Sequence, residues 1–129
     1  MSNEELIQEF ERGNAPGSSF HHADHVHLAF AYLSKYPVLA ALEKFTRALQ
    51  CFALARGKPN LYHETITYAY FFLIRERISR CGVDNWEEFA RRNPDLLVWK
   101  DGILRHYYRE ETLLSELARK VFLLPDKCE

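Results

Sequence analysis

Three helix-breaking residues divide the middle of the chain into segments whose apolar residues recur at helical spacing. Pro37 ends one segment and begins the next in the first-turn position that proline favours, while Gly57 and Gly82 close the two segments that follow. Apolar residues recur within each segment about every three or four positions, as they do on one face of an α-helix. The sequence therefore predicts an all-α fold, a compact helical bundle of four main helices plus short helices toward the C-terminus.

The ends of the expected helices follow from capping patterns as well as from these stops. The 129 residues are enough for one hydrophobic core, so a single helical domain over residues 1–129 is expected. Ser18 or Ser19 is expected to cap the second helix, and Ser2 with Glu5 has the spacing of a capping box. The expected helices cover 2–12, 20–36, 37–56, 60 or 61 to 81, 85–92 (capped by Asp84 and Glu87), a segment from Pro94 onward that Gly102 interrupts, and 111–120, followed by an extended apolar tail at 121–125.

Composition and charge exclude several classes of protein. The formal charge of −1 gives no sign of the basic face that nucleic-acid-binding domains usually carry, and no apolar run is long enough to span a bilayer. Cys51, Cys81 and Cys128 are widely spaced and form no C-x-x-C pair, so neither a disulfide framework nor a thiolate zinc site is indicated. Residues 1–5 are acidic and unlike a secretory signal, and the cysteines suit a reducing compartment. Together these features predict a cytoplasmic protein without nucleic-acid or membrane partners.

Four of the six histidines lie in residues 20–27, at the start of the second predicted helix. With about 100° of rotation per residue, His22 and His25 fall on the apolar face of that helix. His27 and Asp24 project to the opposite side. The apolar periodicity therefore selects His22 and His25 as the pair that faces the interior.

A second polar stretch, residues 62–67, lies near the start of the fourth predicted helix. His63 and Thr67 are one turn apart and fall on its buried face, and Glu64 lies at the edge of that face. If the second and fourth helices are neighbours, both histidine stretches meet at one polar site.

Neutral imidazole is a common ligand of transition metals, and two histidines one turn apart on a helix can share one ion. His22, His25 and His63 are therefore the predicted ligands of one divalent transition metal, with zinc, iron and copper as the candidates. Glu64 is predicted as a further ligand or as a base, and Thr67 as a residue that orients an imidazole or a metal-bound water. This pattern predicts a small metal-dependent enzyme acting on a small, apolar or aromatic molecule, by hydrolysis or by redox chemistry with oxygen.

Two other interpretations stay open at this stage. In the first, the protein is a non-catalytic small-ligand-binding or interaction module with structural histidines. In the second, a His63–Glu64 or His25–Asp24 pair performs acid–base catalysis without a metal. The sequence also leaves the oligomeric state open.

The two histidine motifs together carry a resemblance. Phe20, His22 and His25 form F-x-H-x-x-H ahead of an aromatic amphipathic helix, residues 62–67 read Y-H-E-T-x-T, and the tail at residues 118–126 reads A-R-K-V-F-L-L-P-D. This combination resembles an uncharacterised family of small bacterial all-helical proteins. The resemblance implies an all-helical fold and the same three inward histidines, and it attaches no activity to them.

Overall fold

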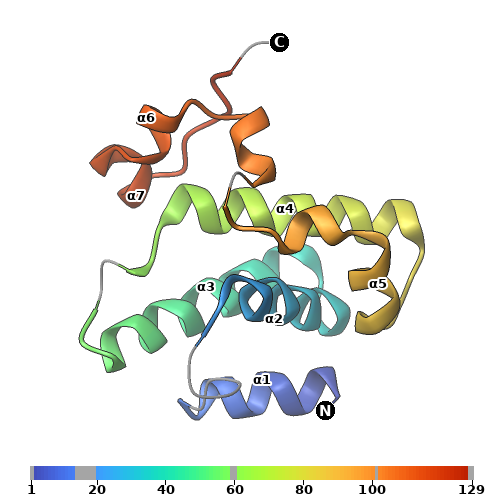
Figure 1. Ribbon diagram of the computed structural model, residues 1–129. Helices are drawn as coiled ribbons and strands as arrows, with labels where there is room; N and C mark the ends of the chain where they lie inside the picture. Colours follow the sequence, from blue (N-terminus) through green and yellow to red (C-terminus); the bar gives the residue numbers. More distant parts are fainter. Residues whose placement is uncertain (1, 14–19, 59–60, 101, 128–129) are drawn as a thin grey trace.

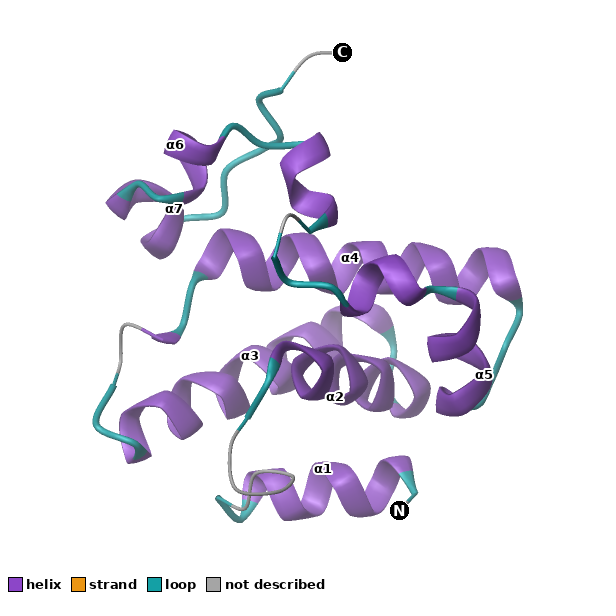
Figure 2. Ribbon diagram, viewed as in Figure 1, coloured by secondary structure: helices purple, strands orange, loops and turns teal. Residues whose placement is uncertain are grey.

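The computed structural model describes residues 2–13, 20–58, 61–100 and 102–127. These residues form helices and loops and no strand, which confirms the all-α prediction (Figure 2). No helix within them is long and apolar enough to cross a membrane. In chain order the helices are α1 (Asn3–Glu11), α2 (His22–Lys35), α3 (Val38–Ala55), α4 (Glu64–Cys81), α5 (Trp86–Arg92), the 3₁₀ helices η2 (Pro94–Leu97) and η3 (Ile103–His106), α6 (Glu110–Leu113) and α7 (Glu116–Lys120).

Helix α2 lies at the centre of the bundle and contacts α1, α3, α4, α5 and η2 (Figure 1). The prediction that α2 and α4 are neighbours is confirmed. The sequence predicted one buried face on α2, but Leu28, Phe30 and Ala31 are buried in addition to Val26 and Ala29. Helices α1 and α5 cover the sides that a two-faced helix would leave in water, so most of α2 beyond its first turn is buried all round.

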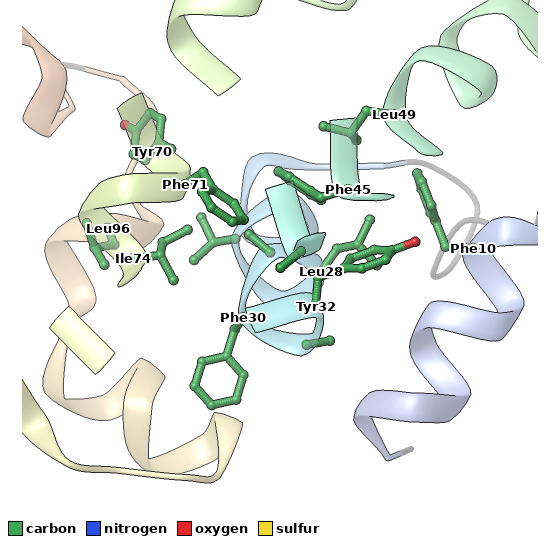
Figure 3. Close-up of a cluster of buried hydrophobic side chains, with 14 of the residues drawn as sticks. Phe10, Leu28, Phe30, Tyr32, Phe45, Leu49, Tyr70, Phe71, Ile74 and Leu96 are labelled. Carbon is green, nitrogen blue, oxygen red and sulfur yellow. The ribbon is translucent and has the colours of Figure 1, made fainter. Parts of the chain in front are cut away.

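Aromatic side chains fill the core around α2, and Figure 3 shows them converging on this helix from its neighbours. The Phe45 and Phe71 rings, from α3 and α4, lie 5.8 Å apart between centroids. The Tyr32 hydroxyl donates a 2.6 Å hydrogen bond to Glu11 and so ties α2 to α1. The core is thus built mainly from the long helices, which hold the first turn of α2 in a fixed place.

Several predicted helix ends are confirmed. Ser2 and Glu5 form the expected capping box, with hydrogen bonds of 2.9 and 3.1 Å in the two directions. Gly82 ends α4 in the left-handed region, at φ 65°, where a glycine pays no steric penalty. Pro37 stands immediately before α3.

The N-terminal ends of α2 and α5 differ from the prediction. The α2 helix begins at His22, and the Asp24 carboxylate accepts the backbone N–H of His21 at 2.9 Å. Ser18 and Ser19 lie outside the described residues. Asn85 caps α5 by accepting the N–H of Glu88 at 2.9 Å, so the predicted capping box of Asp84 and Glu87 is wrong. Asn is itself a preferred cap, and it stands one residue later.

The helix predicted over residues 111–120 is divided in two. Ser115 begins α7 by accepting the N–H of Ala118 at 3.1 Å, and it closes α6 by donating to the carbonyl of Thr112 at 2.8 Å. Serine, whose hydroxyl competes for backbone hydrogen bonds, favours such a break between two helices. Upstream, the segment from Pro94 forms two 3₁₀ helices in place of an α-helix.

The last part of the chain, residues 107–127, packs on the beginning of α4 and is called the C-terminal segment below. Its anchor is Thr65, which is fully buried. The Thr65 hydroxyl lies 2.7 Å from the carbonyl oxygen of Ala118 and 2.9 Å from that of Val121, and it accepts the N–H of Leu123 at 3.1 Å. The prediction of an extended tail laid against the bundle is confirmed.

Candidate functional site

A pocket of ≈ 770 Å³ lies at the end of the bundle where the first turns of α2 and α4 meet the C-terminal half of α3. His22, His25, His63 and Thr67 all line it. The structure therefore brings four of the five predicted site residues to one cavity. Glu64, the fifth, is not among the lining residues.

Aromatic rings from four separate parts of the chain form much of the pocket wall. Phe20 precedes α2, Phe52 belongs to α3, Tyr62 precedes α4 and Trp99 follows η2. The Phe20 and Phe52 rings lie 5.2 Å apart, and Trp99 lies 5.2 Å from the ring of His22. The remaining apolar lining consists of Leu49, Ala53, Leu61 and Ile66. Such a wall suits a ligand with an apolar or aromatic body.

His63 stands before α4 and not within it, which corrects the predicted helix start at residue 60 or 61. The residue is extended, and its Nδ1 accepts the N–H of Ile66 at 3.1 Å, as an N-cap residue does. Because Nδ1 accepts, the proton is on Nε2, which donates to the carbonyl of Leu113 at 2.8 Å. Both nitrogens of His63 are thus engaged, one with its own helix and one with the C-terminal segment.

The neutral form of His63 is favoured by its surroundings. Burial lowers the pKa of His63, and the positive charge of Arg119 lowers it further, against the opposing effect of the hydrogen bond to Leu113. Protonation of Nδ1 would place a proton against a backbone N–H, so it would remove the cap of α4.

His22 is half-buried and holds η2 against the start of α2. Its Nε2 lies 2.9 Å from the carbonyl oxygen of Leu96 and must donate to it, so Nδ1 carries the lone pair. The imidazole packs edge-on against Tyr70, with centroids 4.6 Å apart. Burial lowers the pKa of His22, although the hydrogen bond to Leu96 opposes this shift.

His25 has a buried ring nitrogen that is not paired. Among the described residues, its Nε2 has no hydrogen-bond partner. The ring lies among other rings, 5.2 Å from Phe45, 6.2 Å from His22 and 6.3 Å from Phe20. Burial, assisted by the nearby His22, lowers the pKa of His25 to about 3. A buried polar atom left unpaired costs roughly 1–3 kcal/mol, so each such atom in a folded protein calls for an explanation.

The three predicted metal ligands share the pocket without forming a coordination centre in this arrangement. In the described part of the chain, no group of three or more His, Cys, Asp or Glu side chains is arranged to hold a metal ion. The ring centroids of His22 and His25 are 6.2 Å apart, but both nitrogens of His63 are occupied. Metal ligation by this set stays a prediction.

The two carboxylates of the predicted site have other partners. Glu64 accepts a 2.6 Å hydrogen bond from the Tyr62 hydroxyl, while both nitrogens of its neighbour His63 bond elsewhere. Asp24 accepts a backbone N–H at the start of α2, and the unpaired Nε2 of His25 has no bond to it. The geometry therefore gives neither of the predicted acid–base pairs a mutual hydrogen bond.

Three basic residues of the lining were missed by the sequence analysis: Arg56, Lys58 and Arg119. The guanidinium of Arg56 lies over the ring of Phe52, 4.6 Å from its centroid. Arg56 and Lys58 flank the predicted stop at Gly57, so the sequence placed them at a helix end. Nothing in the sequence brings Arg119 to that end of the bundle, because its place depends on how the C-terminal segment packs.

The remaining histidines divide between the pocket and the surface. His21 belongs to the pocket lining. His27 lies on another side of α2, where its ring stacks on Trp86 with centroids 4.2 Å apart. His106 is exposed, as predicted.

Comparisons of the chain with protein-family models, with curated proteins and with solved structures each found no match. The resemblance based on the two histidine motifs therefore stays a prediction, and the candidate site rests on the geometry described above.

Proposed function

We propose that the protein binds a small molecule with an apolar or aromatic body in this pocket. The observation that carries the proposal is the unpaired, buried Nε2 of His25 beside an aromatic-lined cavity. Folded proteins pair nearly all of their buried polar atoms, and an exception that lines a cavity calls for a partner there, such as a ligand, a water or an ion. A pocket of ≈ 770 Å³ is also within the size range of small-molecule sites.

The two neighbouring histidines have separate tasks in this proposal. His22 keeps its Nε2 proton on the carbonyl of Leu96, so its place in the pocket is fixed before a ligand arrives. His25 lacks such a partner and is the residue whose environment a ligand would change most. The scattered cysteines and the formal charge of −1 support a cytoplasmic location without nucleic-acid partners as part of the same proposal.

Replacing His25 tests the proposal because function and stability should respond in opposite directions. In His25→Phe or His25→Leu we expect the free energy of unfolding to rise by about 1 kcal/mol, since an unpaired buried nitrogen is removed. Naphthoate and naphthamide serve as aromatic test ligands, and calorimetry measures their affinity. We expect both to bind the His25 variants at least about tenfold more weakly than the wild type, a loss of about 1.4 kcal/mol.

His63→Phe is the matched control, because both nitrogens of His63 are paired. We expect that variant to lose about 1–3 kcal/mol of stability through its lost cap and hydrogen bond. If the wild-type protein binds none of naphthoate, phenylacetate, octanoate and their amides, or if the His25 variants bind as the wild type does, the proposed function is wrong.

A metal-dependent enzyme is the second candidate, and the observation in its favour is that His22, His25, His63 and Thr67 line the same pocket. A bound transition metal would supply an activated water or a redox centre. For His63 to join such a site, one ring nitrogen must leave its present partner: either Nδ1 leaves the N–H of Ile66 and α4 loses its cap, or Nε2 releases the carbonyl of Leu113.

Elemental analysis of untagged protein, purified without chelator or nickel resin, tests this candidate. We expect about one equivalent of zinc, copper or iron per chain, lost in both His25→Phe and His63→Ala, if the three histidines act together. Protein that takes up none of these metals after incubation with each would reject the metal candidate and leave the ligand-binding proposal intact.

A further inference from the structure

We infer that the ligand of this pocket is an anion, an apolar or aromatic body that carries a carboxylate or a similar acid group. The inference rests on the proposed function and names its ligand class. It is carried by the charged side chains among the described lining residues, which are all basic.

The charged side chains that line the pocket are Arg56, Lys58 and Arg119, and no aspartate or glutamate is among the described lining residues. The chain as a whole has 17 basic and 18 acidic residues, so this segregation does not follow from the composition. A concave surface with charges of one sign attracts a ligand of the opposite sign.

Two of the three basic side chains are not committed to acidic partners. Within the described residues, Arg56 and Lys58 take part in none of the ion pairs, whereas Arg47 of α3 pairs with Glu43 at 3.2 Å. Arg56 lies instead over the Phe52 ring, 4.6 Å from its centroid. This contact holds a guanidinium beside the apolar wall, where it can meet the acid group of a ligand whose body lies on the rings.

The carboxylates nearest in sequence to the lining residues are already engaged. Asp24 accepts a backbone N–H at the start of α2, and Glu64 accepts the hydroxyl of Tyr62. Both are absent from the lining, so neither carboxylate lies among the basic side chains of the pocket wall. The arrangement favours an amphiphilic anion over a neutral molecule of the same shape.

Matched acid and amide probes separate this inference from the proposed function. The pairs are phenylacetate and phenylacetamide, naphthoate and naphthamide, and octanoate and octanamide, each measured by calorimetry against the full chain. For at least one pair we expect the acid to bind about tenfold more tightly than the amide, since charge-assisted hydrogen bonds are the stronger kind. We expect added salt to reduce this preference.

The double variant Arg56→Gln/Lys58→Gln should abolish the preference, so that the acid and the amide of a pair bind with equal affinity, and its circular dichroism spectrum should match that of the wild type. The control is Lys44→Gln/Arg47→Gln, which removes the same number of positive charges from α3, outside the pocket. We expect this control to bind the acid more tightly than the amide, as the wild type does. Equal binding of acids and amides, or a preference that survives in Arg56→Gln/Lys58→Gln, would overturn the inference while the proposed function stands. If no member of any pair binds, both fail.

Discussion

Replacing Thr65 with valine is expected to lower the free energy of unfolding by about 2–4 kcal/mol, although the two side chains have nearly the same shape. The hydroxyl of Thr65 is fully buried and lies within hydrogen-bond distance of the carbonyl oxygens of Ala118 and Val121 and of the N–H of Leu123. Valine would leave these backbone groups unpaired at a buried position, and each such group costs free energy. Urea unfolding followed by circular dichroism measures the loss.

Thr67→Val is the matched control, since Thr67 is also buried and lies on the same helix but lines the pocket. We expect that change to cost less than about 1 kcal/mol and to act mainly on ligand binding. Limited proteolysis adds a second measurement: Thr65→Val should expose the C-terminal segment to cleavage, and Thr67→Val should not. Equal destabilisation by the two changes would contradict the role assigned to Thr65.

Lowering the pH from 7.5 to 5 is expected to destabilise the protein by about 2 kcal/mol through His25 alone, before the other histidines are counted. The sign follows from the direction of the shift. Burial lowers the pKa of His25 to about 3 in the folded protein, whereas in the unfolded chain it is about 6.5. Below pH 6.5 the unfolded chain therefore binds a proton that the folded protein does not, and stability falls until the pH reaches the folded pKa.

The pKa values of His22, His27 and His63 are also lowered by burial, so they act in the same direction over the same range. Urea unfolding at several pH values between 5 and 7.5 measures the combined slope. In His25→Phe the slope should be smaller by about 0.8 kcal/mol per pH unit on average over this range, and by about 1.4 kcal/mol per pH unit at its acid end, where the unfolded histidine is almost fully protonated. Parallel curves for the variant and the wild type would show that His25 titrates normally in the folded protein.

The sequence predicted the helices well where Pro37, Gly57 and Gly82 delimit them, because these residues act locally on the backbone. It failed at the start of α4 because histidine is not one of the usual capping residues, and the cap depends on which ring nitrogen carries the proton. That choice is made by the carbonyl of Leu113, which is distant in sequence. A helical pattern alone therefore extended α4 too far.

The candidate site was predictable in part, because the residues of one helix face follow from the local sequence pattern. Apolar periodicity selected His22 and His25, and the structure places both at the pocket. Glu64 has the sequence position expected of a base, yet it follows the N-cap and bonds to Tyr62. Trp99 and Arg119 reach the pocket only through tertiary packing, which no local pattern encodes.

The central position of α2 means that the walls of the pocket differ in how freely evolution or protein engineering can change them. His22 and His25 begin a helix that is surrounded by other elements, so most substitutions further along it, as at Ala29 or Phe30, disturb the core. Arg56 and Trp99 are exposed lining residues, so changes there disturb the core less than changes in α2 do. Homologous proteins should therefore acquire new ligand preferences through the exposed wall while retaining the histidine pair.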